Sequence, residues 1–136
     1  MSSIPFFLMA KPDAVKRGLV GEIISRFEKK GFVLRQLRYL RPPEISGIMA
    51  SHYQEHIGKN FYDNLLTFSL SGSICAMIWE GNIQVARSMV GATLPWDAAS
   101  GTIRGDYACS LPANLVHCSD TPESAAREVE LWSGML

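Results

Sequence analysis

Six consecutive residues near the N-terminus, Pro5 to Ala10, constrain the fold of this chain more than any other stretch, because all of them are apolar. A short continuous apolar run of this length is typical of a β-strand that is buried on both faces. The run ends abruptly at Lys11-Pro12-Asp13. We therefore expect a central strand over residues 5–10, with Lys11 leaving the sheet at its edge.

The next segment predicts an amphipathic helix between Gly18 and Gly31. Its apolar residues recur with the helical spacing i, i+3, i+4, i+7, and two lysines followed by a glycine form a typical helix end. The apolar positions are Val20, Ile23, Ile24 and Phe27.

The remaining pattern predicts further strands and helices in alternation. They are a strand over Phe32–Leu40, a helical region from Pro43 to Phe68 bent at Gly58, a strand over Ile74–Trp79, a helix over Ile83–Val90, a long irregular stretch from Gly91 to Asp106, a strand around His117 and a closing helix over 120–132. This order predicts an α+β fold: a ferredoxin-like antiparallel four-stranded sheet covered by helices, which we expect on one face. We expect a single domain over residues 1–136.

Composition excludes some classes of function. The formal net charge is zero, whereas general nucleic-acid or membrane-surface binders carry a basic excess. The first residues of the sequence lack the charged-then-apolar pattern of a targeting signal, and no apolar run approaches the ~20 residues needed to span a membrane. The three cysteines, Cys75, Cys109 and Cys118, form no C-x-x-C pair, which favours free thiols in a reducing cytosol. We expect a cytoplasmic protein.

The stretch Asn114 to Asp120 carries the most suggestive chemistry. On a strand, His117 and Ser119 would point to one face while Val116 and Cys118 point to the other. In the helix that follows, Asp120 is a good N-cap, Glu123 would complete a capping box and Pro122 suits the first turn.

This helix could fold back on the strand and bring Glu128 beside His117. The carboxylate would then hold the far imidazole nitrogen and leave the near nitrogen free to attack. A lone histidine among apolar residues is more often structural, so this stretch alone leaves both interpretations open.

Phosphate binding would have to proceed without a glycine-rich loop. Neither a Walker A sequence nor G-x-G-x-x-G occurs. Dispersed cations, namely Lys11, Arg87 and Arg104, could hold phosphates instead. Each of them alone is more often a solvated surface charge, and Phe61 and Tyr53 are likewise more often packing residues than ligand contacts.

Taken together, the sequence closely resembles the nucleoside diphosphate kinase family over nearly the whole chain. The matching stretches are Lys11-Pro-Asp-Ala-Val15, Arg17–Glu28, His52-Tyr53, Met77-Ile-Trp-Glu-Gly81, Gly91-Ala-Thr93 with Pro95, Gly101–Asp106, and Asn114–Asp120 with Glu123-Ser-Ala125.

The resemblance implies a ping-pong phosphoryl transfer with broad base specificity. A nucleoside triphosphate would give its γ-phosphate to His117, and a nucleoside diphosphate would take it. Ser119 and Glu128 would stand behind the histidine, Phe61 would lie against the base with Leu111 opposite, and the phosphates and ribose would be held by Lys11, Tyr53, Arg87, Thr93, Arg104 and Asn114. Magnesium would bridge the nucleotide's own phosphates, with Asp120 reaching it at most through water.

The chain departs from the family pattern at two places near this site. Cys118 replaces the glycine that usually follows the histidine, and Pro112-Ala113 replaces a glycine-arginine pair. We expect an active enzyme, and a homo-oligomer that is either a tetramer or a hexamer. The competing interpretation is a catalytically weak nucleotide-binding or regulatory module. His52 and His56 are expected to be solvated surface residues.

Overall fold

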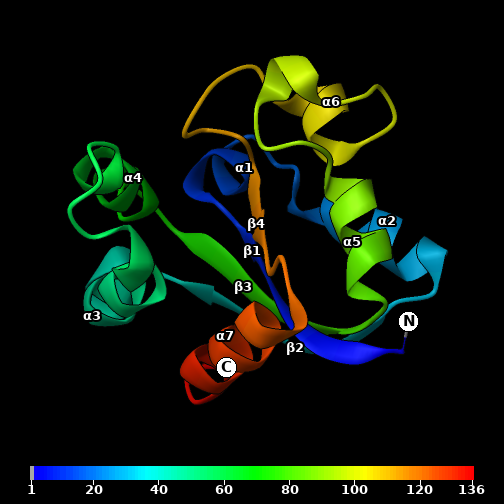
Figure 1. Cartoon of the computed structure of the whole chain (residues 1–136), viewed down its shortest axis with the longest axis horizontal. Coiled ribbons are helices and arrows are strands. Elements are labelled where there is room, and N and C mark those ends of the chain that lie inside the picture. Colours follow the sequence, from blue (N-terminus) through cyan, green and yellow to red (C-terminus); the bar gives the residue numbers. More distant parts are fainter. Residues whose placement is uncertain (1) are drawn as a thin grey trace.

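The computed structural model describes residues 2–136, which form one antiparallel four-stranded sheet in the order β2-β3-β1-β4 (Figure 1). The strands are β1 (Ile4–Ala10), β2 (Val33–Leu40), β3 (Ile74–Gly81) and β4 (Val116–Cys118). The helices are α1 (Pro12–Lys16), α2 (Val20–Lys30), α3 (Pro42–His52), α4 (Tyr62–Ser69), α5 (Ile83–Val90), α6 (Ile103–Tyr107) and α7 (Pro122–Ser133), with 3₁₀ turns at Gln54–His56 and Pro95–Asp97. This arrangement confirms the predicted fold class.

The central strand β1 is buried on both faces, as its apolar run predicts. It pairs with β3 along one edge and with β4 along the other. Successive side chains of a strand point to opposite faces, so Phe6 and Leu8 enter one core while Phe7 and Met9 enter the other.

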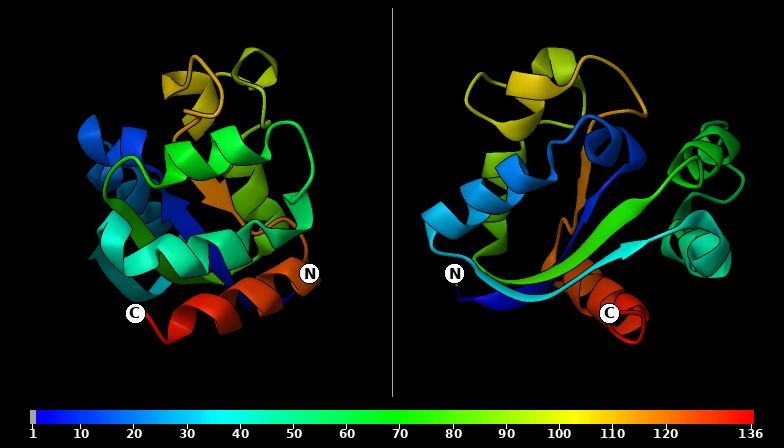
Figure 2. Two further views of the ribbon diagram at one scale, coloured as in Figure 1. Left: turned by 90° about the vertical axis from the view of Figure 1, so that its left-hand side faces the viewer. Right: turned by 180° about the vertical axis from the view of Figure 1, so that it is seen from behind.

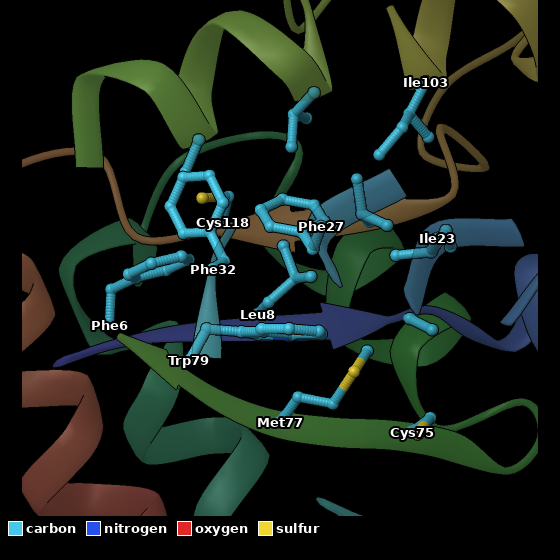
Figure 3. Close-up of a cluster of buried hydrophobic side chains, with 14 of the residues drawn as sticks. Phe6, Leu8, Ile23, Phe27, Phe32, Cys75, Met77, Trp79, Ile103 and Cys118 are labelled. Carbon is cyan, nitrogen blue, oxygen red and sulfur yellow. The ribbon is translucent and has the colours of Figure 1, made fainter. Parts of the chain in front are cut away.

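The first core lies between the sheet and the helices α2 and α5. Aromatic side chains gather here, among them Phe6, Phe27, Phe32 and Trp79 (Figure 3). Burying a large apolar side chain stabilises a fold by roughly 1.5–3 kcal/mol. Gly31 ends α2 with a φ of 103°, a left-handed conformation that suits glycine, as the helix-end signal predicts.

The second core lies on the opposite face, beneath α3 and α7. It contains Ile45 and Met49 from α3 and Trp132 from α7, and α2 and α3 lie on opposite sides of the sheet (Figure 2). The expectation of helices on one face is therefore wrong. A sheet whose middle strands are apolar on both faces has to be covered on both.

Two local predictions are also corrected. The stretch Gly91–Asp106 is not irregular throughout, because Thr102 caps the short helix α6 by accepting a hydrogen bond from Gly105 N–H. The N-cap of α7 is Thr121, which accepts from Ser124 N–H, and not Asp120 with Glu123. Asp120 and Thr121 are both residue types that can cap a helix. Because α7 starts at Pro122, the N-cap position directly before it falls on Thr121.

No helix within residues 2–136 is long and apolar enough to cross a membrane.

Candidate active site

His117 lies in the middle of β4 and faces a cavity of about 590 Å³. Its strand neighbours Val116 and Cys118 point into the first core, so the histidine points to the opposite face. Its side chain keeps 22% exposure. The short strand thus presents one polar side chain to the cavity and buries the apolar residues on either side of it.

Glu128 of α7 fixes the ring of His117. Nε2 of His117 lies 2.8 Å from Oε1 of Glu128, and the Ser119 hydroxyl donates to the same oxygen at 2.9 Å. Ser119 is itself fixed, because its oxygen accepts from the backbone N–H of Phe7. A neutral imidazole carries one N–H. When Nε2 donates it to the carboxylate, Nδ1 keeps a free lone pair.

The surroundings favour the neutral ring. Burial lowers the pKa of His117 well below its ordinary value, and the cations Lys11, Arg104 and Arg87 lower it further. Burial also raises the pKa of the Glu128 carboxyl, although the hydrogen bond from Ser119 opposes that shift. The ring of His117 is therefore uncharged near neutral pH, which is the form in which a ring nitrogen can act as a nucleophile.

Two buried cations lie beside the histidine. The Nζ atom of Lys11 donates to Oδ1 of Asn114 at 2.8 Å, and burial together with the nearby Arg104 lowers the pKa of Lys11 to about 8. Arg104 is only 4% exposed, and its pKa is lowered to about 10 by burial and by Arg87. Within residues 2–136 neither Lys11 nor Arg104 forms an ion pair with a carboxylate, and a buried cation without such a partner can receive an anion.

The side chain of Arg104 also holds backbone segments of the site together. Its guanidinium donates to the carbonyl oxygens of Val116 at 2.7 Å, Gly91 at 3.1 Å and Asn114 at 3.3 Å. It thereby ties β4 to the segment that begins at Gly91. The planar five-donor fork of arginine suits this task.

Further polar residues line the cavity near these cations. Arg87 of α5 donates to the carbonyl of Cys118 at 3.1 Å, and the side-chain amide of Asn114 donates to the carbonyl of Thr93 at 2.9 Å. Tyr53 is 5% exposed, and burial raises its pKa to about 12, so it stays a neutral phenol.

Two exposed apolar side chains stand among the residues that line the cavity. Phe61 and Leu111 both line it, with 47% and 44% of their surface exposed. The exposed carboxylate of Asp120 lines it too. A flat, uncharged ligand group could lie between Phe61 and Leu111 while a charged group reaches inward to the cations.

The structure brings the predicted site residues to one place. Eleven of them line this cavity, and Ser119 lies behind it, bonded to Glu128. The lining residues are Lys11, Tyr53, Phe61, Arg87, Thr93, Arg104, Leu111, Asn114, His117, Asp120 and Glu128.

One cavity residue was misjudged from the sequence. His52, expected at the surface, is only 2% exposed, and its ring centre lies 4.4 Å from that of His117. Its Nδ1 accepts a hydrogen bond from the indole N–H of Trp132 at 3.0 Å. The position at the end of a helix, directly before Tyr53, was the available sequence signal. His56 is half-buried and also lines the cavity.

Cys118 and Pro112-Ala113, the two departures from the family pattern, do not disturb the geometry of the site. Cys118 lies in β4, and among residues 2–136 the only non-glycine residue with a positive φ is Leu115. Cysteine is therefore unstrained where a glycine usually stands. Pro112 lies at the cavity wall and its carbonyl accepts from Lys11 at 3.3 Å.

A metal ion does not suit the inner end of the cavity. His52, His117 and Glu128 each place one donor atom within 4.8 Å of the others. However, the indole N–H of Trp132 occupies Nδ1 of His52, so a neutral His52 carries its proton on Nε2 and offers no lone pair there. The cluster is better described as a hydrogen-bonding site.

Comparison with known proteins agrees with this geometry. A family model described as nucleoside diphosphate kinase matches residues 6–134. The chain is 52% identical over 134 residues to a nucleoside diphosphate kinase of Schizosaccharomyces pombe, covering 97% of this chain and 87% of that one. It is 54% identical over 129 residues to one from Carboxydothermus hydrogenoformans, covering 93% and 85%. A Halobacterium salinarum nucleoside diphosphate kinase solved in complex with CDP superposes with a TM-score of 0.90 at 42% identity, covering 96% and 87%.

Proposed function

Because this chain belongs to the nucleoside diphosphate kinase family, we propose that it transfers the γ-phosphate between nucleotides through a phosphohistidine on Nδ1 of His117. The observation that carries this assignment is the hydrogen bond from Nε2 of His117 to Glu128, at 2.8 Å. It occupies one ring nitrogen and leaves the other free toward the cationic cavity.

The transfer has two half-reactions. In the first, the Nδ1 lone pair attacks the γ-phosphorus, an N–P bond forms, and the bond from phosphorus to the bridging oxygen breaks. The nucleoside diphosphate leaves with that electron pair. In the second, a terminal oxygen of another nucleoside diphosphate attacks the phosphorus, and the N–P electrons return to Nδ1. Throughout, Nε2 keeps its proton and Glu128 stabilises the charge that develops on the ring.

The cations supply most of the catalysis. Phosphoryl transfer asks little covalent chemistry of the protein and depends on positioning and charge neutralisation. Lys11, Arg87 and Arg104 converge on the cavity beside His117. They neutralise the phosphoryl oxygens and hold the phosphorus and its leaving oxygen in line with Nδ1.

Magnesium is proposed to arrive with the nucleotide. Mg²⁺ prefers oxygen ligands, keeps several waters and is usually held by substrate phosphates with one or two carboxylates. The exposed Asp120 at the cavity fits this role through a bridging water. When bound, the ion neutralises charge on the phosphates.

The nucleotide is proposed to bind with its base between Phe61 and Leu111 and its phosphates inward. The Halobacterium relative was solved with CDP, which supports a nucleoside diphosphate as the ligand. Thr93, Asn114 and Tyr53 line the same cavity and supply further polar groups.

A catalytically weak nucleotide-binding or regulatory module is the second candidate. It would be favoured if residues of the inner site were replaced. Since the nucleophile, its carboxylate and the three cations are all present and brought together, catalysis is the better-supported function.

We also propose a single domain over residues 1–136, a homo-oligomer and a cytosolic location. The edge strand β2 leaves Val33 and Tyr39 exposed, at 46% and 52%, and Trp96 is 70% exposed. Such apolar groups suit contacts between copies of the chain. Light scattering distinguishes a tetramer from a hexamer. The buried free thiols of Cys75 and Cys118 suit a reducing compartment.

Labelling with γ-³²P-ATP tests the mechanism directly. The protein is incubated with the nucleotide and separated on a denaturing gel without acid. We expect a label that is labile in acid, stable in alkali, released by a nucleoside diphosphate, and absent from His117→Ala. An acid-stable label, or one that survives in His117→Ala, would refute the assignment.

A further inference from the structure

The ring of His52 is held in a single tautomer by Trp132. The indole N–H donates to Nδ1 of His52 at 3.0 Å, and both side chains are buried, with exposures of 2% and 0%. An indole nitrogen can only donate. Nδ1 of His52 therefore carries the lone pair, and the neutral ring carries its proton on Nε2.

This Nε2–H is a donor without an acceptor. Among residues 2–136 no group accepts a hydrogen bond from it, although the atom is buried. A buried donor that stays unsatisfied is destabilising, and such groups in a native structure call for an explanation.

The position of the His52 ring beside His117 offers an explanation for this unpaired donor. The ring centres of His52 and His117 lie 4.4 Å apart with the planes at 83°, and a ring nitrogen of each lies within 4.8 Å of the other. Both residues line the same cavity. A phosphoryl group that arrives at the free nitrogen of His117 would bring its three negatively charged oxygens into the cavity that His52 also lines.

We propose that the Nε2–H of His52 donates a hydrogen bond to a phosphoryl oxygen while the group is transferred to and from His117. The inference rests on the proposed phosphohistidine and adds a catalytic residue to it. His52 keeps its proton throughout, so the bonds that form and break are those already described for the transfer to and from His117. A hydrogen bond to an anionic oxygen is short and strong, and it strengthens in a site closed to water.

The charge state of His52 agrees with a donor and not with a general acid. Burial and the neighbouring His117 lower the pKa of His52 well below its ordinary value, while Glu128 opposes the shift. The ring therefore stays neutral, with one proton on Nε2 and none to give away.

Two substitutions separate this role from simple packing. His52→Phe keeps a flat ring and removes both nitrogens, whereas His52→Gln keeps an amide N–H near the position of Nε2–H. We expect the single-turnover rate of phosphohistidine formation from γ-³²P-ATP, measured by rapid quench, to fall about 10- to 100-fold in His52→Phe. It should recover to within several-fold of wild type in His52→Gln, with affinity for ADP unchanged in both.

A wild-type rate in folded His52→Phe, or equal losses in both variants, would overturn the proposal. Absence of any label on wild-type protein would instead refute the phosphohistidine itself, so the two failures are distinguishable.

A spectroscopic test needs no substitution. In a long-range ¹H–¹⁵N spectrum of the wild-type protein, His52 should show the Nε2–H tautomer, and that resonance should shift when His117 is phosphorylated. An Nδ1–H tautomer, or a resonance that does not move, would overturn the proposal.

Discussion

The Oε1 atom of Glu128 lies 2.8 Å from Nε2 of His117, and these two residues come from different elements, a helix and a strand. The same oxygen accepts the Ser119 hydroxyl. One carboxylate oxygen thus fixes the tautomer of the histidine and its rotation about the side-chain bonds. The proposed nucleophile is thus oriented before a substrate binds, which is how a rigid site lowers a barrier.

Glu128→Gln tests this arrangement. The amide oxygen can still accept the Nε2–H of His117 but carries no negative charge, so the ring loses the stabilisation of the charge that develops on it. We expect kcat to fall about 10- to 100-fold, the range for residues that orient a reactive ligand. Glu123→Gln, on an exposed part of the first turn of α7, is the matched control and should behave as wild type. Complete loss of phosphohistidine in a folded Glu128→Gln protein would show that Glu128 takes part in the chemistry itself.

The pH dependence of kcat/KM reports the pKa values of essential groups in the free enzyme. We expect its acid and alkaline limbs to arise from different residues. Because the pKa of His117 is lowered, its nucleophilic neutral form persists as the pH falls below the ordinary histidine value of 6.5. The acid side should therefore stay flat from pH 7 to about pH 5 after correction for titration of the nucleotide phosphate. A half-maximal point near pH 6.5 would contradict the lowered pKa.

The alkaline limb should come from Lys11. Its pKa is about 8, so its positive charge is lost as the pH rises through that value, and kcat/KM should fall. Lys11→Arg offers the control, since an arginine stays charged at these pH values. Its absolute activity should be lower, but the decline near pH 8 should disappear. A decline that persists in Lys11→Arg would assign the limb to another group.

Arg104→Lys should damage stability as well as activity. The guanidinium bonds three backbone carbonyls, and a lysine cannot reach all three at once. With two hydrogen bonds lost at about 1 kcal/mol each, we expect the free energy of unfolding to fall by about 2 kcal/mol. Urea denaturation at a fixed protein concentration measures it. Arg87→Lys is the comparison, because the guanidinium of Arg87 donates only one hydrogen bond to a backbone carbonyl. An equal decrease in the free energy of unfolding in Arg87→Lys would refute the proposal that Arg104 holds the backbone of the site together.

Sequence reasoning succeeded where one local pattern decided the outcome. The apolar run of β1 predicted a doubly buried strand, and alternation along residues 114–120 placed His117 opposite Val116 and Cys118. The same alternation, with a helix folded back on the strand, anticipated the contact between His117 and Glu128.

It failed where a distant residue decided. His52 has the local environment of a surface helix end, and its burial depends on Trp132, which lies 80 positions later in the chain. The start of α7 at Pro122 likewise depends on where β4 ends, and it gives the cap to Thr121 and not to Asp120. Neither outcome follows from spacing alone.

The last prediction concerns which bases the enzyme accepts. A site that reads a base needs buried donors and acceptors aimed at the edge of that base, and such a site can discriminate by large factors. Here the cavity offers the ring of Phe61 and the side chain of Leu111, both partly exposed. Stacking on an aromatic ring is worth about 1–3 kcal/mol per base and tolerates every base.

We therefore expect kcat/KM values for purine and pyrimidine diphosphates to lie within about 100-fold of one another, with purines favoured by their larger stacking area. Phe61→Ala should lower all of these values and narrow the preference for purines, because it removes the surface on which the difference arises. Ile57→Ala, which trims an exposed apolar residue outside the cavity lining, should change neither. A preference above about 1,000-fold for one base corresponds to roughly 4 kcal/mol, more than stacking supplies, and would require a polar contact to the base edge.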